Sequence, residues 1–231
     1  MGLEVRGFDP PLALADFRLA AFDMDSTLIC IECIDEIAQA AGRKAEVAAI
    51  TEAAMRGEIA DYKQSLRQRL ALLRGVPAEA LETVWEERLR LNPGVETFVQ
   101  ACRAAGLKTL LVSGGFTFFS ARVQRRLGLD FARANVLEIE DGRLTGHLVP
   151  QAWGEIVDGA EKRRVLLEVA DLMGVPASRT LAVGDGANDL PMMGAAGLSI
   201  AFHAKPAVRE KAMISITQGG LDRALEVLRP A

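Results

Sequence analysis

Short apolar segments, each followed by polar residues, recur along the chain at wide intervals. They cover residues 18–23, 108–113 and 180–185. Helical spacing fills the intervals, and the stretch from Pro93 to Ala105 ends at Gly106, as helices commonly do. The stretch from Glu161 to Met173 ends in the same way at Gly174. Strands and helices therefore alternate, which predicts an α/β fold, a Rossmann-like parallel sheet with helices around it.

A parallel sheet of this kind predicts where a ligand binds. Ligands of open α/β sheets lie beyond the carboxyl ends of the strands. Asp23, Ser113 and Asp185 stand at the ends of the three predicted strands. We therefore expect these residues to converge on one crevice although they are far apart in the sequence.

The alternation is interrupted between residues 31 and 90, where Ala, Leu, Glu and Arg dominate at helical spacing. Gly42, Gly57 and residues 75–77 divide this stretch into several helices. Its place between the first and second strands predicts an inserted helical cap over the crevice. The expected organisation is a catalytic core of residues 18–30 and 91–231, a cap of residues 31–90, and a short amino-terminal extension of residues 1–17.

A second interruption follows later in the chain. Two segments, Asn135–Glu140 and Leu144–Val149, flank Asp141-Gly142-Arg143. An Asp-Gly pair between two such segments favours a tight β-hairpin turn. We expect a small antiparallel flap here.

Composition narrows the class of protein. Half of the 231 residues are hydrophobic and a quarter are charged, which is enough for a sizeable core. The net charge of -4 gives no basic field for nucleic acid or an anionic membrane. No apolar run is long enough to span a bilayer, and the first ten residues lack a signal-peptide pattern. A cytoplasmic protein with a small-molecule substrate is expected, with neither nucleic acid nor membrane as partner.

The cysteines are few. Cys30, Cys33 and Cys102 are an odd number, which fits a reducing compartment. Cys30 and Cys33 have the C-x-x-C spacing of redox and zinc sites, but His147 and His203 stand alone and supply no paired ligands. Small packing residues are the favoured interpretation.

Asp23 and Asp25 are the strongest chemical signal. Two carboxylates so close together repel unless a cation lies between them, and an oxygen-only pair favours Mg²⁺ over zinc. Asp23 could attack phosphorus to form an aspartyl phosphate, and Asp25 could move the proton to the leaving group and from water. Either residue alone would be an ordinary turn or helix-capping aspartate.

Two later segments supply further candidates. Ser113 and Gly114 could hold phosphoryl oxygens with a hydroxyl and backbone N–H groups, although both are also ordinary turn residues. Gly184-Asp185-Gly186-Ala187-Asn188-Asp189 is more specific, because glycines let the backbone approach a metal. Asp185 is the expected third metal ligand, with Asp189 beside it. Lys162 stands in a charge run that is typical of a solvated helix start, and Arg163 is its alternative.

These motifs, in this order and spacing, resemble the haloacid dehalogenase superfamily of phosphohydrolases, and the resemblance covers almost everything after residue 17. It implies an HAD-type fold, with Asp23 as nucleophile and Asp25 as proton donor. It also implies a magnesium site and a set of phosphate contacts. The implied metal ligands are Asp23, Asp25 and Asp185, and the implied phosphate contacts are Ser113, Gly114, Lys162 and Asn188.

Four other segments resemble the members of that superfamily that hydrolyse O-phospho-L-serine in serine synthesis. They are Ile31–Ala38, Ala54–Gly57, Ser65–Arg69 and His203–Pro206. The resemblance implies that they face the substrate, and that Glu32 and Arg69 read its ammonium and carboxylate groups, for which an arginine fork is well suited. Without the matching motifs, Glu32 and Arg69 would be a surface charge pair. Met55, Phe116 and Phe118 either line the pocket or pack in the core.

Alternatives remain open at this point. Phosphohomoserine or another small phosphate monoester needs the same acid-base groups, and one methylene changes binding by only about 1 to 3 kcal/mol. Transfer to an alcohol acceptor is a further alternative. A phosphorylatable signalling module belongs to a different class, but Asp25 argues against it because it would activate water against the acyl phosphate.

Overall fold

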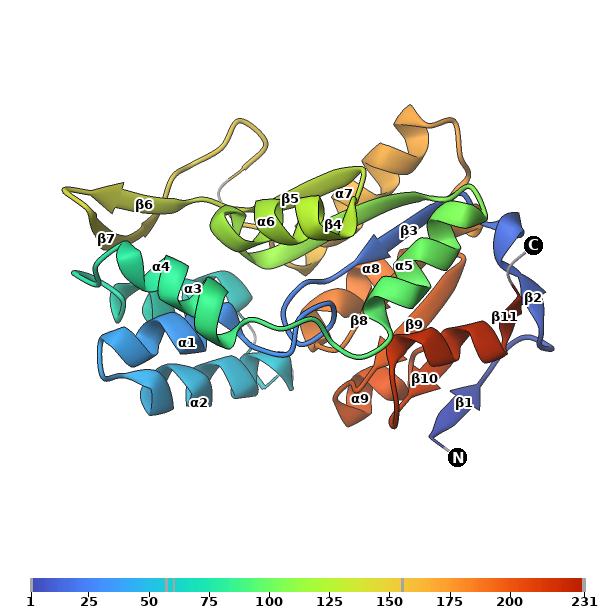
Figure 1. Cartoon of the computed structure of the whole chain (residues 1–231), viewed down its shortest axis with the longest axis horizontal. Coiled ribbons are helices and arrows are strands. Elements are labelled where there is room, and N and C mark those ends of the chain that lie inside the picture. Colours follow the sequence, from blue (N-terminus) through green and yellow to red (C-terminus); the bar gives the residue numbers. More distant parts are fainter. Residues whose placement is uncertain (1, 57, 60, 155, 230–231) are drawn as a thin grey trace.

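The computed structural model describes residues 2–56, 58–59, 61–154 and 156–229, and within them the central feature is a seven-stranded sheet (Figure 1). Its order is β1-β10-β9-β8-β3-β4-β5. The strands are β1 (Leu3–Val5), β3 (Leu19–Phe22), β4 (Lys108–Phe116), β5 (Phe131–Asn135), β8 (Thr180–Gly184), β9 (Leu198–Phe202) and β10 (Ile214–Ile216). Every neighbouring pair is parallel except β1 and β10, which confirms the predicted α/β class.

The three strands expected from the sequence lie side by side. β3 is central and pairs with β8 on one side and with β4 on the other. Parallel strands end at the same edge of a sheet, so the residues that follow them meet there. β4 is longer than predicted, because Ser113 and Gly114 do not form a turn but continue the strand to Phe116, where it pairs with Asn135 after a register shift.

Helices cover both faces of this sheet, and alternating strand residues point toward each layer. Ala20 and Phe22 of β3 belong to one core cluster, whereas Leu19 and Ala21 belong to the other. The first cluster is closed by α5 (Val95–Ala104), α6 (Thr117–Leu127) and the 3₁₀ helix η5 (Leu221–Glu226). The second is closed by α7 (Gly159–Leu172), α8 (Leu190–Ala195) and α9 (Pro206–Arg209).

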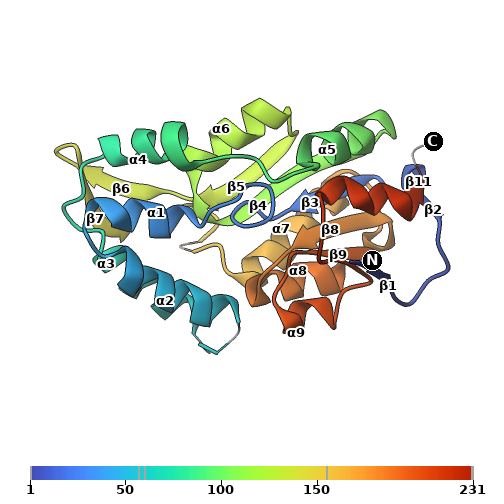
Figure 2. The same cartoon turned by 60° about the horizontal axis from the view of Figure 1, so that its bottom comes forward.

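Between β3 and α5 the chain forms helices at one end of the molecule, away from most of the sheet (Figures 1 and 2). They are α1 (Cys33–Ala40), α2 (Lys44–Met55), α3 (Tyr62–Ala71), α4 (Glu79–Thr83) and the π-helix η2 (Val84–Arg88). We propose that they form the separate cap expected from the sequence. Gly57, which we expected to separate two of these helices, lies outside the described residues.

The expected hairpin is confirmed as β6 (Leu137–Glu140) and β7 (Arg143–Leu148). Asp141 and Gly142 make its turn with positive φ angles of 48° and 72°, as a tight hairpin requires. The hairpin is bound to the cap, because the Gly75 N–H donates to the Leu144 carbonyl and the Ala78 N–H to the Gly142 carbonyl, both at 2.8 Å.

Residues 2–17, expected only as part of a short amino-terminal extension, contain two strands. β1 adds an antiparallel edge to the main sheet, and β2 (Leu12–Ala13) pairs with β11 (Leu228–Arg229). Short 3₁₀ turns complete the chain: η1 (Leu14–Asp16), η3 (Ala177–Arg179) and η4 (Ala187–Asp189). Within the described ranges, no helix has the length and apolar character needed to cross a membrane.

Candidate active site

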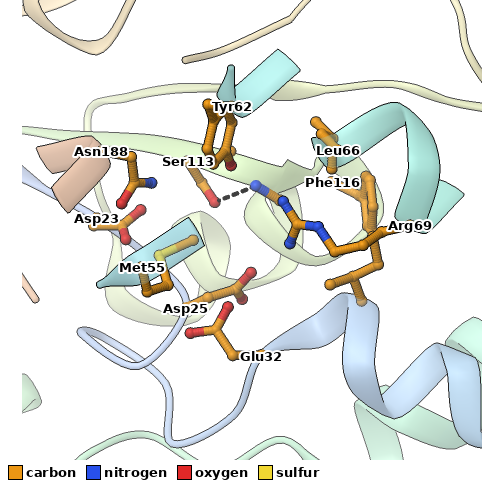
Figure 3. A pocket seen from close by; sticks show the side chains of 13 residues that line it. Asp23, Asp25, Glu32, Met55, Tyr62, Leu66, Arg69, Ser113, Phe116 and Asn188 are labelled. Atoms are coloured by element: carbon orange, nitrogen blue, oxygen red, sulfur yellow. Dashed lines mark hydrogen bonds between the residues drawn. The ribbon is translucent and has the colours of Figure 1, made fainter. Parts of the chain in front are cut away.

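A cavity lies between the carboxyl ends of the central strands and the cap helices (Figure 3). Its core wall contains Asp23, Asp25, Ser113, Gly114 and Asn188, all of them predicted site residues. The structure therefore brings together segments that are up to 165 residues apart, from Asp23 after β3 to Asn188 in η4.

The cap supplies the opposite wall. Glu32, Met55, Tyr62, Leu66 and Arg69 face the core across the cavity. Figure 3 shows the Asp23 carboxylate and the Arg69 guanidinium pointing into the cavity from opposite sides.

The aromatic and methionine candidates divide into two groups. Met55 and Phe116 line the cavity. Phe118 is not among its lining residues, because its ring packs edge-on against Phe119, with a centroid distance of 4.9 Å, and under the Arg122 guanidinium. Phe118 is therefore a packing residue.

Lys162 does not itself line the cavity but lies behind the core wall, where it is the electrostatic centre. Asp158 caps α7 by accepting from the Glu161 N–H, and this start of the helix directs Lys162 inward. The fully buried ammonium donates to Asp23 Oδ1 and to Asp189 Oδ1, both at 2.7 Å. Burial lowers the Lys162 pKa, but the two carboxylates raise it by more, so this lysine stays charged. Arg163, the alternative, is exposed.

The loop after β8 positions two further carboxylates. Asp189 Oδ2 accepts from the backbone N–H groups of Asp185 and Gly186 at 3.1 and 3.0 Å. Gly184 is needed here, because a β-carbon at this position would collide with Asp189. Asp185 Oδ1 in turn accepts from the buried Thr27 hydroxyl at 3.0 Å.

The carboxylates of Asp23, Asp185 and Asp189 lie within 4.8 Å of one another, as the ligands of one cation would. This is the sole such group among the described residues, so the cysteines do not form a zinc site with the histidines. Asp25 is not part of the group, and its role as a metal ligand stays a prediction. Both oxygens of Asp189 already accept hydrogen bonds, which leaves Asp23 Oδ2 and Asp185 Oδ2 as the oxygens without a recorded donor.

Burial and neighbouring charge shift the pKa of both candidate catalytic aspartates. Burial and the Asp189 charge raise the pKa of Asp23 to about 7, although Lys162 opposes the shift. Burial raises the pKa of Asp25 to about 6, and the Cys33 thiol and the Lys162 charge oppose it. A cation among these groups would reverse part of these shifts, because it stabilises ionised carboxylates.

Glu32 is held on the loop that follows Asp25. Its Oε1 accepts from the Ser26 hydroxyl at 2.6 Å, and Ser26 adopts a left-handed φ of 55°. Burial, and then the charge of Asp25, raise the Glu32 pKa well above its usual range. A carboxylate in this position favours a cationic ligand.

Arg69 is 2% exposed, yet its hydrogen bonds are few and long. Nη1 donates to Thr51 Oγ1 at 3.2 Å and Nε to the Ser65 carbonyl at 3.4 Å. Nη2 is buried without a partner, and so are Asp25 Oδ1 and Asn188 Oδ1. All three residues line the cavity, where a polar ligand would satisfy them.

Sequence reasoning missed several contributors. Asn135 is fully buried, donates to the Gly114 carbonyl and accepts from the Val157 N–H, both at 2.8 Å, and thereby fixes the end of β4. Tyr62 places its hydroxyl so close to Gly114 that a β-carbon there would collide with it. An aromatic residue on a cap helix and a strand-end asparagine carry no motif, so spacing alone could not have identified them.

One predicted substrate-facing segment lies elsewhere. Residues 203–205 connect β9 to α9, which begins at Pro206, and none of these residues lines the cavity. Lys205 instead donates to Glu52 Oε2 of α2 at 2.7 Å. A second contact between cap and core is the ion pair of Lys63 and Asp158 at 3.3 Å. Lys205 of this segment therefore contacts the cap and not the cavity.

The chain is similar to known proteins. Residues 20–194 match the family of haloacid dehalogenase-like hydrolases. The chain is 65% identical to the phosphoserine phosphatase of Albidiferax ferrireducens over 99% of this chain and 97% of that protein. It is 64% identical to the phosphoserine phosphatase of a Polaromonas species, with the same two coverages.

The fold is also similar to solved structures of phosphoserine phosphatases. A phospho-aspartyl intermediate analogue of phosphoserine phosphatase superposes with a TM-score of 0.86 at 40% identity, covering 92% of this chain and 99% of that one. A substrate-bound phosphoserine phosphatase complex gives the same values.

Proposed function

The chain belongs to the phosphoserine phosphatases of the haloacid dehalogenase-like hydrolase family, and on that premise we propose that it hydrolyses O-phospho-L-serine to L-serine and phosphate with Mg²⁺. One observation carries the proposal. Glu32 and the unpartnered Nη2 of Arg69 face Asp23 across a single cavity. Phosphoserine has the ammonium, carboxylate and phosphoryl groups that these three residues require.

The chemical step begins at Asp23. A carboxylate oxygen attacks phosphorus, the bond to the serine oxygen breaks, and an aspartyl phosphate forms. Lys162 donates to Asp23 Oδ1 at 2.7 Å and thereby fixes the orientation of the carboxylate. Water then attacks the phosphorus, phosphate leaves and Asp23 is regenerated.

Asp25 moves the proton in both halves. Its Oδ1 has no partner and its pKa of about 6 is close to neutrality, as a general acid and base requires. It protonates the departing serine oxygen and then accepts a proton from the attacking water. This turnover argues against a signalling module, which must preserve its acyl phosphate.

The phosphoryl group is held by the core wall. Ser113 and Gly114 present a hydroxyl and backbone at the end of β4, and Asn188 presents its amide from η4. Lys162 balances the carboxylates, so that they do not repel an anionic substrate. Phe116 and Met55 supply apolar surface beside these groups.

The aspartate cluster fits Mg²⁺, because its donors are hard carboxylate oxygens. We assign Asp23 and Asp185 as the side-chain ligands and Asp189 as their support. When bound, the cation would neutralise charge on the phosphoryl oxygens. We also propose that the protein acts in the cytoplasm, at the last step of serine synthesis, and its three free cysteines are consistent with a reducing compartment.

The test is phosphate release from O-phospho-L-serine beside phosphohomoserine, phosphothreonine and p-nitrophenyl phosphate, with and without a chelator. Phosphoserine should be preferred, and chelation should abolish turnover until Mg²⁺ is restored. Asp23→Asn serves as the blank. Equal rates on all four substrates would keep the phosphatase chemistry and reject the substrate, whereas stable phosphorylated protein without turnover would favour a signalling module.

A further inference from the structure

Arg69 is a buried cation that is not directly paired with a carboxylate in the described part of the chain. Its Nη1 instead donates to the hydroxyl of Thr51, on the neighbouring helix α2. Thr51 is 1% exposed and does not line the cavity, so it has no route of its own to a ligand. Its hydrogen bond to Arg69 is a route by which Thr51 can affect binding.

The Thr51 hydroxyl has a defined direction. Its Oγ1 lies 2.6 Å from Asp35 Oδ1 on α1 and 3.1 Å from the Val47 carbonyl of its own helix. A hydroxyl carries one proton, and the shorter contact to a carboxylate is the stronger hydrogen bond. The proton therefore points to Asp35, and the oxygen lone pairs remain for Arg69.

The resulting relay, Asp35 to Thr51 to Arg69, joins all three long cap helices. Asp35 polarises the hydroxyl and thereby makes it a better acceptor for the guanidinium. The charge of Asp35 is held one residue away from Arg69, so it does not occupy the fork. A direct carboxylate partner would compete with an anionic ligand for Nη2, which remains unpartnered in the cavity.

We propose that Thr51 and Asp35 are positioning residues that aim Arg69 at the substrate carboxylate and thereby set the preference for an amino-acid phosphate over a plain amine phosphate. This inference rests on the proposed function. It separates two roles in the cap: Glu32 selects the ammonium group, and the relay selects the carboxylate.

The experiment compares two substrates that differ only in that carboxylate, O-phospho-L-serine and O-phosphoethanolamine. Thr51→Val keeps the shape of the side chain and removes its hydroxyl. It should raise the KM for phosphoserine about tenfold, as expected for one hydrogen bond to a charged group, with kcat within twofold. The KM for phosphoethanolamine should stay within twofold, and Thr51→Ser should restore the value for phosphoserine.

Asp35→Ala provides a second test, because the hydroxyl is then free to turn to the Val47 carbonyl. It should give the same selective rise with a smaller size, and unchanged phosphoethanolamine turnover shows that each variant is folded. A loss on both substrates alike, or no change for phosphoserine, would overturn the relay. A wild-type protein without preference for phosphoserine would overturn the proposed function and the relay with it.

Discussion

The two walls of the cavity differ in how far their charged groups are already satisfied. On the core wall, Lys162 contacts two carboxylates at 2.7 Å, and Asp189 also accepts from two backbone N–H groups. On the cap wall, Arg69 makes two hydrogen bonds of 3.2 and 3.4 Å, and Nη2 makes none. The cation of the core wall is therefore paired inside the protein, whereas the cation of the cap wall keeps an unpartnered donor for a ligand.

This difference separates chemistry from recognition. A network whose members are all bonded to one another is held in place before the substrate arrives, which is what stabilising a transition state requires. A buried cation without a partner gains most when an anion binds. Core substitutions should therefore affect every phosphate ester, whereas cap substitutions should affect only substrates that carry the amino-acid groups.

Asp23→Asn should give the largest effect, because it removes the nucleophile and keeps the shape of the side chain. We expect kcat to fall on the order of 10⁴-fold or more, equally for O-phospho-L-serine and p-nitrophenyl phosphate. Thermal unfolding of the variant is the control for folding. A loss confined to phosphoserine would contradict the division between the two walls.

Lys162→Met should damage both activity and stability. Without the ammonium, Asp23 and Asp189 become buried carboxylates without their cation, which destabilises a fold by about 3 to 5 kcal/mol. Turnover of both esters should fall on the order of 10³-fold, because the nucleophile loses its orientation.

The matched control is Arg163→Ala, one residue along α7 and exposed. Its unfolding free energy should change by no more than about 0.5 kcal/mol. Urea denaturation without divalent cations measures both variants. Equal stabilities for the two would mean that Lys162 does not hold the core wall together.

Arg69→Met should show the opposite pattern. The catalytic efficiency for phosphoserine should fall about 100-fold, because the charge that reads the carboxylate is gone. Turnover of p-nitrophenyl phosphate should change less than threefold. Stability should not fall, since replacing a buried, poorly bonded cation with an apolar side chain is often neutral or favourable. Gln68→Ala, exposed on the same helix, is the control, and a stability loss like that of Lys162→Met would contradict the comparison.

The core wall was largely predictable from the sequence, whereas the cap wall was only partly so. Asp23 and Asp185 follow apolar strands, and the topology of a parallel sheet brings such strand ends together. The bonds of Lys162 were not predictable, because a charged run at a helix start is usually solvated and only the packing of α7 buries one member of it.

On the cap wall, resemblance identified Glu32 and Arg69, but nothing in the pattern identified their supports. Thr51 stands mid-helix, where hydroxyl residues commonly bond their own backbone, and only the three-dimensional packing of α1 against α2 turns it to Asp35. Tyr62 was missed for a related reason, since an aromatic residue at a helix start is most often a packing residue.

Tyr62 is a cap residue that lies close to the core wall, so its substitution tests the division between the two walls. It belongs to the cap helix α3, yet its hydroxyl lies against Gly114 of β4. Figure 3 shows Tyr62 beside Ser113, a residue that we propose to hold the phosphoryl group. Burial raises the phenol pKa, although Arg69 and Lys162 oppose the shift, so the hydroxyl is a neutral donor. No hydrogen bond to it is recorded within the described residues, which leaves the donor for a phosphoryl oxygen.

Tyr62→Phe should therefore have the smallest effect and a core-like pattern. Loss of one neutral hydrogen bond corresponds to about 0.5 to 1.5 kcal/mol, or a two- to tenfold rise in KM. The rise should be equal for O-phospho-L-serine and O-phosphoethanolamine, because the phosphoryl group is common to both. Steady-state kinetics on the two esters measures this. A rise in KM for phosphoserine alone would place Tyr62 with Arg69. A residue's role would then depend on whether it belongs to the cap or the core, and not on the substrate group it contacts.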